Sequence, residues 1–140
     1  MEPWKSFPYK PASGEGQGEL PFCPALLISP VSAVVADALL DSGATVCVLP
    51  HSVGITLGFQ WDKARPSLPL GGNLARFEAR SVILKVALPD FPPQLVEFSW
   101  SRSENVPVIL GQRNFFHLFD VRFSGLARRF DLRLSAPSDF

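Results

Sequence analysis

From residue 22 onward, short apolar runs are separated by Pro, Gly, Ser and Asp, and several runs alternate apolar with polar residues. A period of two predicts antiparallel strands with one face buried, and the spacing is typical of an all-β protein. The strands predicted in this way span residues 22–28, 34–40, 46–49, 82–88, 95–100, 108–110, 121–123 and 130–134. Only 51–57 and 112–119 have a helical pattern, and both are short.

Residues 1–21 have a different composition, because they contain four prolines and three glycines. Prolines remove backbone donors and glycines add chain entropy, so an irregular arm is predicted. Trp4, Phe7 and Tyr9 are its exceptions, and three aromatic residues in an arm predict packing against the domain or a partner chain. The predicted organisation is therefore an arm over 1–21, one domain over 22–136 and a tail over 137–140.

Composition narrows the class of protein. The chain has 140 residues, with 13 Lys and Arg against 13 Asp and Glu. This balance disfavours nucleic-acid binding and electrostatic docking on an anionic membrane. The longest apolar run, 31–40, is interrupted by Ser32 and Asp37 and is too short to span a bilayer. Two cysteines make no disulfide framework, so free thiols and a soluble cytoplasmic domain are expected.

One segment combines a carboxylate with strongly apolar flanks. Residues 38–50 read ALLDSGATVCVLP, so Asp41, Ser42 and Gly43 stand between two apolar strands. These three residue types also form ordinary turns. The apolar flanks, however, predict that the turn is drawn into the core, where an unpartnered carboxylate costs several kcal/mol. Asp41 is therefore expected to be bonded, paired or used in chemistry.

Two further segments accompany this one. In residues 106–116, VPVILGQRNFF, an apolar strand ends at Gly111 and passes into a short helix. In residues 67–78, SLPLGGNLARFE, the sequence Gly71-Gly72-Asn73 predicts a hairpin tip.

In this order the three segments resemble the retropepsin-like aspartic proteases, over roughly residues 22–134. The resemblance implies an all-β, single-lobe acid-protease fold, a closed barrel-like structure with one or two short helices. It also implies roles for particular residues. These are Asp41 as the catalytic residue, Ser42, Gly43 and Ala44 as its supporting loop, Leu70, Gly71, Gly72, Asn73 and Leu74 as a substrate-binding flap, and Val108, Ile109, Leu110 and Gly111 as the second signature. The flap is short and has no bulky residue at its tip, and residues 1–21 match nothing in the family.

Peptide hydrolysis by aspartates needs two carboxylates that hold one water. The chain has a single Asp-Ser-Gly, so the second carboxylate is expected from another copy. The family resemblance likewise implies a two-fold homodimer that cleaves an extended peptide, with Ser42 bonding across the axis. The expected function is an aspartic endopeptidase that needs no cofactor. The alternative is a catalytically silent module for peptide binding or dimerisation on the same fold. For the dimer contact, the alternating strand 130–134 and the aromatic arm are candidates.

Other chemistry has weaker support. Cys47 and His51 are four residues apart, and Cys23 and His117 are also present, but no second pair has metal-ligand spacing. Cys47 is interpreted as a small buried hydrophobic residue. No metal site is predicted.

Overall fold

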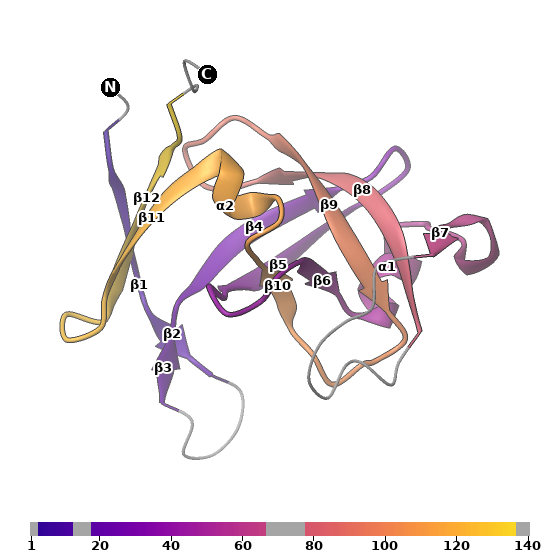
Figure 1. Cartoon of the computed structure of the whole chain (residues 1–140), viewed down its shortest axis with the longest axis horizontal. Helices are drawn as coiled ribbons and strands as arrows, with labels where there is room; N and C mark the ends of the chain where they lie inside the picture. The colour runs from indigo at the N-terminus through magenta and orange to yellow at the C-terminus, as the bar shows by residue number, and fades with distance from the viewer. Residues whose placement is uncertain (1–2, 13–17, 67–77, 137–140) are drawn as a thin grey trace.

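The computed structural model describes residues 3–12, 18–66 and 78–136 (Figure 1). Its strands are β1 (Lys5–Pro8), β2 (Lys10–Pro11), β3 (Glu19–Leu20), β4 (Phe22–Ile28), β5 (Ala33–Leu40), β6 (Cys47–Leu49), β7 (Arg65–Pro66), β8 (Ala79–Ala87), β9 (Gln94–Ser101), β10 (Val108–Leu110), β11 (Phe119–Ser124) and β12 (Arg129–Leu134). The helices are α1 (His51–Thr56), the 3-10 turn η1 (Trp61–Lys63) and α2 (Phe115–Leu118). All eight predicted strands are present, with bounds that differ from the predicted ones by three residues at most, which confirms the all-β prediction.

Six strands close into a barrel in the order β4-β5-β10-β6-β9-β8, and β8 pairs back onto β4. Most neighbours are antiparallel, but β5 runs parallel to β10 and β6 runs parallel to β9. The alternating strands turn one apolar row inward, whereas the short β6 and β10 are buried throughout. On β8 and β9 the buried rows begin with Val82 opposite Phe98 and continue with Leu84 opposite Val96.

Helix α1 packs against one end of this core at Trp100. A Cβ on Gly54 would come within 2.1 Å of Trp100 Nε1, so only glycine allows this close packing. The indole N–H also donates to the carbonyl of His51 at 3.0 Å. The region of 51–57 predicted to be helical is confirmed, and 112–119 is helical only over α2.

The terminal segments form a separate sheet in the order β1-β12-β11, beside the barrel and away from α1 and β7 (Figure 1). The prediction of an irregular arm is wrong here, because β1 pairs with β12 in the register Phe7 to Phe130. These two rings stack with centroids 5.3 Å apart, so the arm packs against its own chain, as one of the two predicted alternatives stated. The pairing joins residues at opposite ends of the chain, which local composition does not report.

On the outer face of this sheet, Trp4 lies between two guanidinium groups. The Cζ atoms of Arg122 and Arg133 are 4.1 and 4.3 Å from its ring centroid. The strand predicted over 130–134 is present as β12, but it is the central strand and has partners on both edges. It therefore presents no open edge to another chain, and the free edges belong to β1 and β11. No helix among the residues that the structure describes is long and apolar enough to cross a membrane.

Candidate active site

The parallel pairing of β5 with β10 determines where the candidate catalytic loop begins. In its register Leu40 lies beside Leu110, so both strands end at the same level. The next residue, Asp41, donates its backbone N–H to the carbonyl of Leu110 at 3.0 Å. The loop that begins at Asp41 and the segment that begins at Gly111 therefore leave the barrel together.

Two hydrogen bonds shape the first turn of the loop. Asp41 Oδ1 accepts the backbone N–H of Gly43 at 2.9 Å, and the Asp41 carbonyl accepts the N–H of Ala44 at 3.1 Å. The first bond is the Asx type, in which a side chain bonds its own backbone two residues later. It holds the carboxylate against the turn while leaving its second oxygen without a described hydrogen-bond partner.

The loop is more exposed in the single chain than the apolar flanks predict. Asp41 is half-buried, Ser42 and Gly43 are exposed, and the carboxylate has no ion-pair partner in the described part of the chain. The expectation of a core position is wrong because the flanking strands end at the barrel rim. Their apolar side chains are buried on either side while the turn between them reaches the surface.

The second signature supports the loop through its backbone. A Cβ on Gly111 would lie 2.4 Å from the Val46 carbonyl oxygen and 2.8 Å from that of Ala44, so glycine allows the two segments to touch. After Gly111, the N–H of Gln112 donates to the carbonyl of Ala44 at 2.9 Å, and the N–H of Arg113 donates to the carbonyl of Thr45 at 2.9 Å. The segment after β10 thus runs directly alongside the loop.

Gln112 makes one more contact that the sequence reading missed. Its side-chain Nε2 donates to the carbonyl of Ser42 at 2.8 Å. The only signal in the sequence was its position directly after Gly111.

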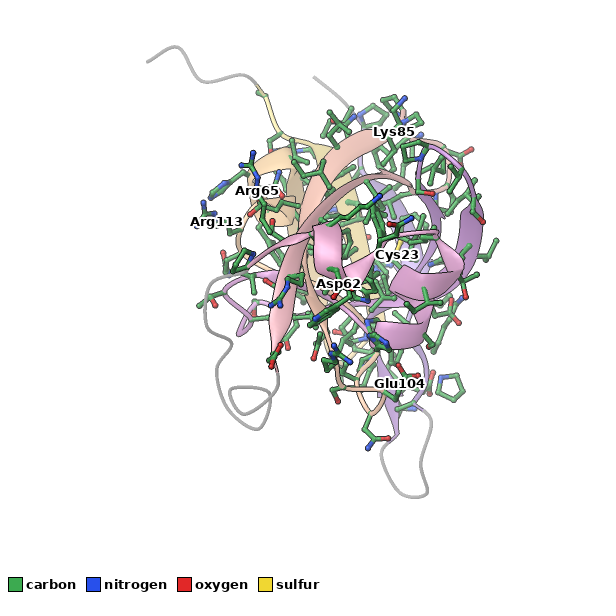
Figure 2. All side chains as sticks on the ribbon, turned by 90° about the vertical axis from the view of Figure 1, so that its right-hand side faces the viewer. Cys23, Asp62, Arg65, Lys85, Glu104 and Arg113 are labelled. Atoms are coloured by element: carbon green, nitrogen blue, oxygen red, sulfur yellow. The ribbon has the colours of Figure 1, made fainter. Side chains whose placement is uncertain are left out.

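Cys47, on strand β6, links the end of the Asp41 loop to the segment that follows β10. Its buried Sγ accepts the N–H of Gly111 at 3.3 Å and lies 3.5 Å from the carbonyl oxygen of Arg113, to which the thiol donates. Burial raises the pKa of this thiol, and burial raises that of Cys23 to about 12. Both are therefore held as neutral thiols, and Figure 2 shows Cys23 among the barrel strands.

His51 does not turn toward Cys47. Its ring stacks on Trp100 with centroids 5.6 Å apart. Across the described residues, no group of three or more His, Cys, Asp and Glu side chains is positioned to hold a metal.

A small apolar cluster, separate from the main core, adjoins the loop. Its buried members are Val48 and Ile109, which pair across β6 and β10. Partly buried side chains packed against them are Ala44, Val46, Ala79 and Val106. Since Ala44 and Val46 belong to the loop itself, the Asp41 turn has apolar surface beside it.

Two solved structures are similar to this architecture. One is a retropepsin-like aspartic protease from Rickettsia conorii, with a TM-score of 0.63 and 15% identity over 94% of this chain and 93% of that chain. The chain has the retropepsin-like fold. The other is EIAV protease complexed with the inhibitor HBY-793, with a TM-score of 0.53 and 17% identity over 72% of this chain and 88% of that chain. Neither a family model nor a curated protein sequence matches the chain.

The similarity to these structures confirms the retropepsin-like fold that the three segments predicted. The predicted flap, Leu70, Gly71, Gly72, Asn73 and Leu74, lies outside the described residues. The strands that flank it are described, and β7 pairs with β8 in the register Arg65 to Ser81. The chain therefore leaves β7 and returns on β8 at neighbouring positions.

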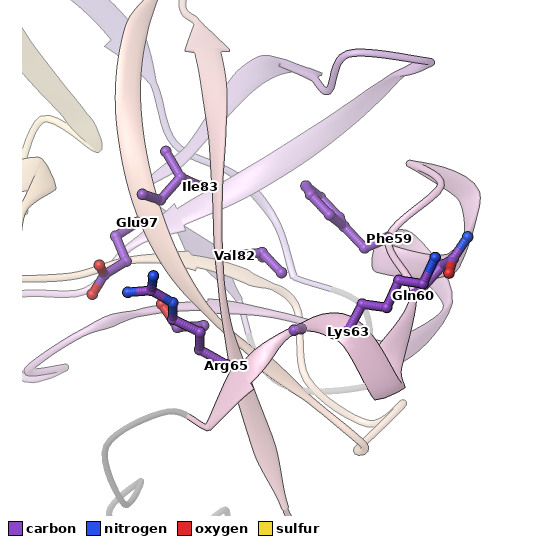
Figure 3. Close-up of a pocket in the computed structure, with 9 residues that line it drawn as sticks. Phe59, Gln60, Lys63, Arg65, Val82, Ile83 and Glu97 are labelled. Atoms are coloured by element: carbon purple, nitrogen blue, oxygen red, sulfur yellow. The ribbon is translucent and has the colours of Figure 1, made fainter.

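A groove of about 460 Å³ lies between residues 59–65 and strand β8, and Asp41 is not among its lining residues (Figure 3). Phe59, Val82 and Ile83 supply apolar lining, and charged side chains lie around them. Asp41 and the second signature do not line this groove, so it is not the candidate active site.

Proposed function

We propose that this protein is a homodimeric aspartic endopeptidase in which the Asp41 carboxylates of two chains share one water. The supporting observation is the geometry of Asp41. Its carboxylate is oriented by the Gly43 N–H at the rim of a retropepsin-like barrel and has no ion-pair partner among the described residues. Both similar structures are named as proteases, which supports the same chemistry.

In the proposed reaction one Asp41 is ionised and its counterpart is protonated. Two carboxylates about 3 Å apart cannot both ionise, so they share a proton. The ionised group takes a proton from the water, whose oxygen attacks the scissile carbonyl carbon. The protonated group donates to the carbonyl oxygen, which gives a diol intermediate. The C–N bond then breaks as the Asp41 that holds the water proton gives it to the leaving nitrogen, and a diol hydroxyl returns a proton to the other Asp41.

The dimer follows from the presence of one motif per chain. Ser42 and Gly43 are exposed in the single chain, and the Ser42 hydroxyl has no hydrogen-bond partner among the described residues. A hydroxyl can both donate and accept, so it suits a bond to the matching loop across the axis. Since β12 has partners on both edges, we propose that the contact is centred on these loops.

The proposed substrate is an extended peptide with apolar side chains on either side of the scissile bond. The partly buried side chains that pack on Val48 and Ile109 offer apolar surface beside the Asp41 loop; they are Ala44, Val46, Ala79 and Val106. In this proposal residues 70–74 serve as the flap that covers the bound peptide and excludes water.

Subunit mixing tests the shared site most directly. The wild-type protein is assayed on a peptide library between pH 3 and pH 8, alone and with increasing Asp41→Asn protein, while sedimentation records the assembly. Mixed dimers have one carboxylate, so activity should fall as the variant captures wild-type chains. Asp62→Asn, at an exposed position on η1, is the matched control and should leave activity unchanged.

Two results would contradict the proposal. One is a monomer that cleaves peptides at the assay concentration. The other is a wild-type dimer that binds peptides and cleaves none across this pH range, which would instead identify the silent binding module.

A further inference from the structure

We infer that Gln112 is a positioning residue that holds the Asp41 carboxylate in place through the Ser42–Gly43 peptide. This inference rests on the proposed catalytic role of Asp41. Two hydrogen bonds meet at that one peptide unit. Gln112 Nε2 donates to the Ser42 carbonyl at 2.8 Å, and the Gly43 N–H donates to Asp41 Oδ1 at 2.9 Å.

The geometry of a trans peptide links the two bonds. Its C=O and N–H point in opposite directions and belong to one rigid plane, so fixing the carbonyl also fixes the direction of the N–H. The Gln112 amide therefore aims the Gly43 N–H at Asp41. A bonded carbonyl also polarises its peptide, which makes the N–H at the other end a better donor.

The side chain of Gln112 is already oriented for this bond. Its backbone N–H donates to Ala44 at 2.9 Å, and the preceding Gly111 lies against the Ala44 and Val46 carbonyls. With its backbone tied to the far side of the turn, Gln112 reaches Ser42 without spanning a flexible gap. The residue thus contacts the turn on both sides of Gly43.

The turn itself leaves little room for movement. A Cβ on Gly43 would lie 3.3 Å from Asp41 Oδ1, a tight contact, so the Gly43 backbone lies directly against the carboxylate. Rotation of the Ser42–Gly43 peptide would remove the one described hydrogen bond to the Asp41 side chain. Within the described residues, the Gln112 amide is the side-chain group that opposes this rotation.

Hydrogen exchange of the Gly43 amide tests the inference whether or not the protein cleaves peptides. Gln112→Met keeps the length of the side chain and removes the donor. We expect Gly43 exchange to become roughly two- to tenfold faster, the factor equivalent to a typical net hydrogen bond. The Leu40 amide, which is bonded to Pro21 in the barrel, should be accelerated less than the Gly43 amide, and the melting temperature should fall by no more than a few degrees. Gln60→Met removes an exposed amide elsewhere and is the matched control.

Unchanged Gly43 exchange in Gln112→Met would overturn the inference. Equal acceleration at Gly43 and Leu40 would also overturn it, because a general loss of stability would then be the cause.

Activity supplies a second readout that a purely structural role would not move. Gln112→Met should lower kcat roughly two- to tenfold with KM unchanged, at every pH. Gln112→Glu carries a donor only while protonated, and a glutamate ordinarily has a pKa of about 4.3. The loss of kcat in Gln112→Glu, relative to the wild type, should be small near pH 3.5 and should grow toward pH 6. A loss of kcat in Gln112→Glu that does not change with pH would contradict the role of the donor. A wild-type protein without activity would count against the proposed function alone. The exchange of the Gly43 amide would then decide whether Gln112 positions the carboxylate.

Discussion

The side chains of Asp41 and Asp131 differ in burial and in the number of groups bonded to the carboxylate. Asp41 lies at the barrel rim, half-buried, with one backbone N–H on its carboxylate. Asp131 lies in the terminal sheet with its side chain only 2% exposed. The Ser6 hydroxyl donates to its Oδ1 at 2.5 Å, and the Arg122 guanidinium contacts its Oδ2 at 2.9 Å.

The difference shows what each carboxylate can do. At Asp131 the protein supplies a hydroxyl and a cation, so the charge is satisfied within the fold. The Ser6 hydrogen bond, followed by the contact with Arg122, holds the pKa of Asp131 below its ordinary value despite burial. At Asp41 acceptor sites remain open toward the surface, as the proposed binding of a water requires. A satisfied carboxylate stabilises the fold, whereas an open one is available for chemistry.

The largest expected effect is on activity. Asp41→Asn should lower peptide cleavage by about a thousandfold or more, because an amide cannot act as the base. Its melting temperature should stay close to that of the wild type, because Asn Oδ1 can still accept the Gly43 N–H. Cleavage assays beside thermal unfolding measure both quantities. Full activity in the purified variant would remove Asp41 from the mechanism.

Gly111→Ala should destabilise the protein by about 3 kcal/mol, because the new Cβ would strike backbone oxygens that cannot rotate away. Urea unfolding measures the change. Gly125→Ala is the control, since a Cβ there meets no atom within 4 Å. Equal stability of the two variants would mean that the second signature does not press against the Asp41 loop.

Asp131→Asn should reduce the free energy of unfolding by about 1–3 kcal/mol at pH 7, because charge-assisted bonds to Ser6 and Arg122 are lost. Activity per folded molecule should remain, which is the reverse of Asp41→Asn. Loss of activity at unchanged stability would break the contrast between the two aspartates.

The same residue predicts a pH dependence. The pKa of Asp131 is lowered in the fold, so its stabilisation is present above the unfolded value of about 3.9 and is lost as the pH falls below it. Wild-type stability should therefore fall below about pH 4, and Asp131→Asn should show a shallower fall. The stability of the variant should still fall with pH to some extent, because hydrogen bonds from Arg133 and Ser135 also lower the pKa of Asp120. Identical slopes between pH 4 and pH 2 would contradict the assignment.

The smallest effects concern the two buried thiols. Cys23→Ala and Cys47→Ala should each cost about 1–2 kcal/mol in packing, and Cys47→Ala should cost more because the Gly111 N–H loses its acceptor. Both variants should keep their activity. In the folded wild type, raised pKa values and burial should make both thiols unreactive toward Ellman's reagent. Fast labelling of either cysteine would show that the barrel opens readily.

Local patterns in the sequence determined most of the fold. The strands of the barrel and β12 could be predicted because alternation of apolar and polar residues is a property of neighbours in the chain. The Asp-Ser-Gly turn, the glycine-tipped segment 67–78 and the segment before Gly111, in this order, predicted the retropepsin-like fold, which the similar structures confirm.

Only the tertiary structure decided the surroundings of individual side chains. The alternation placed Asp131 on a polar face, but Ser6, 125 residues away in sequence, covers it when β1 pairs with β12. Gln112 has no local pattern that predicts its bond to Ser42, 70 residues earlier. Asp41 was expected in the core, yet it lies at the rim because β5 and β10 end there together. Periodicity reports which face of a strand is buried, whereas the partners of a side chain depend on distant segments that only the folded chain brings into contact.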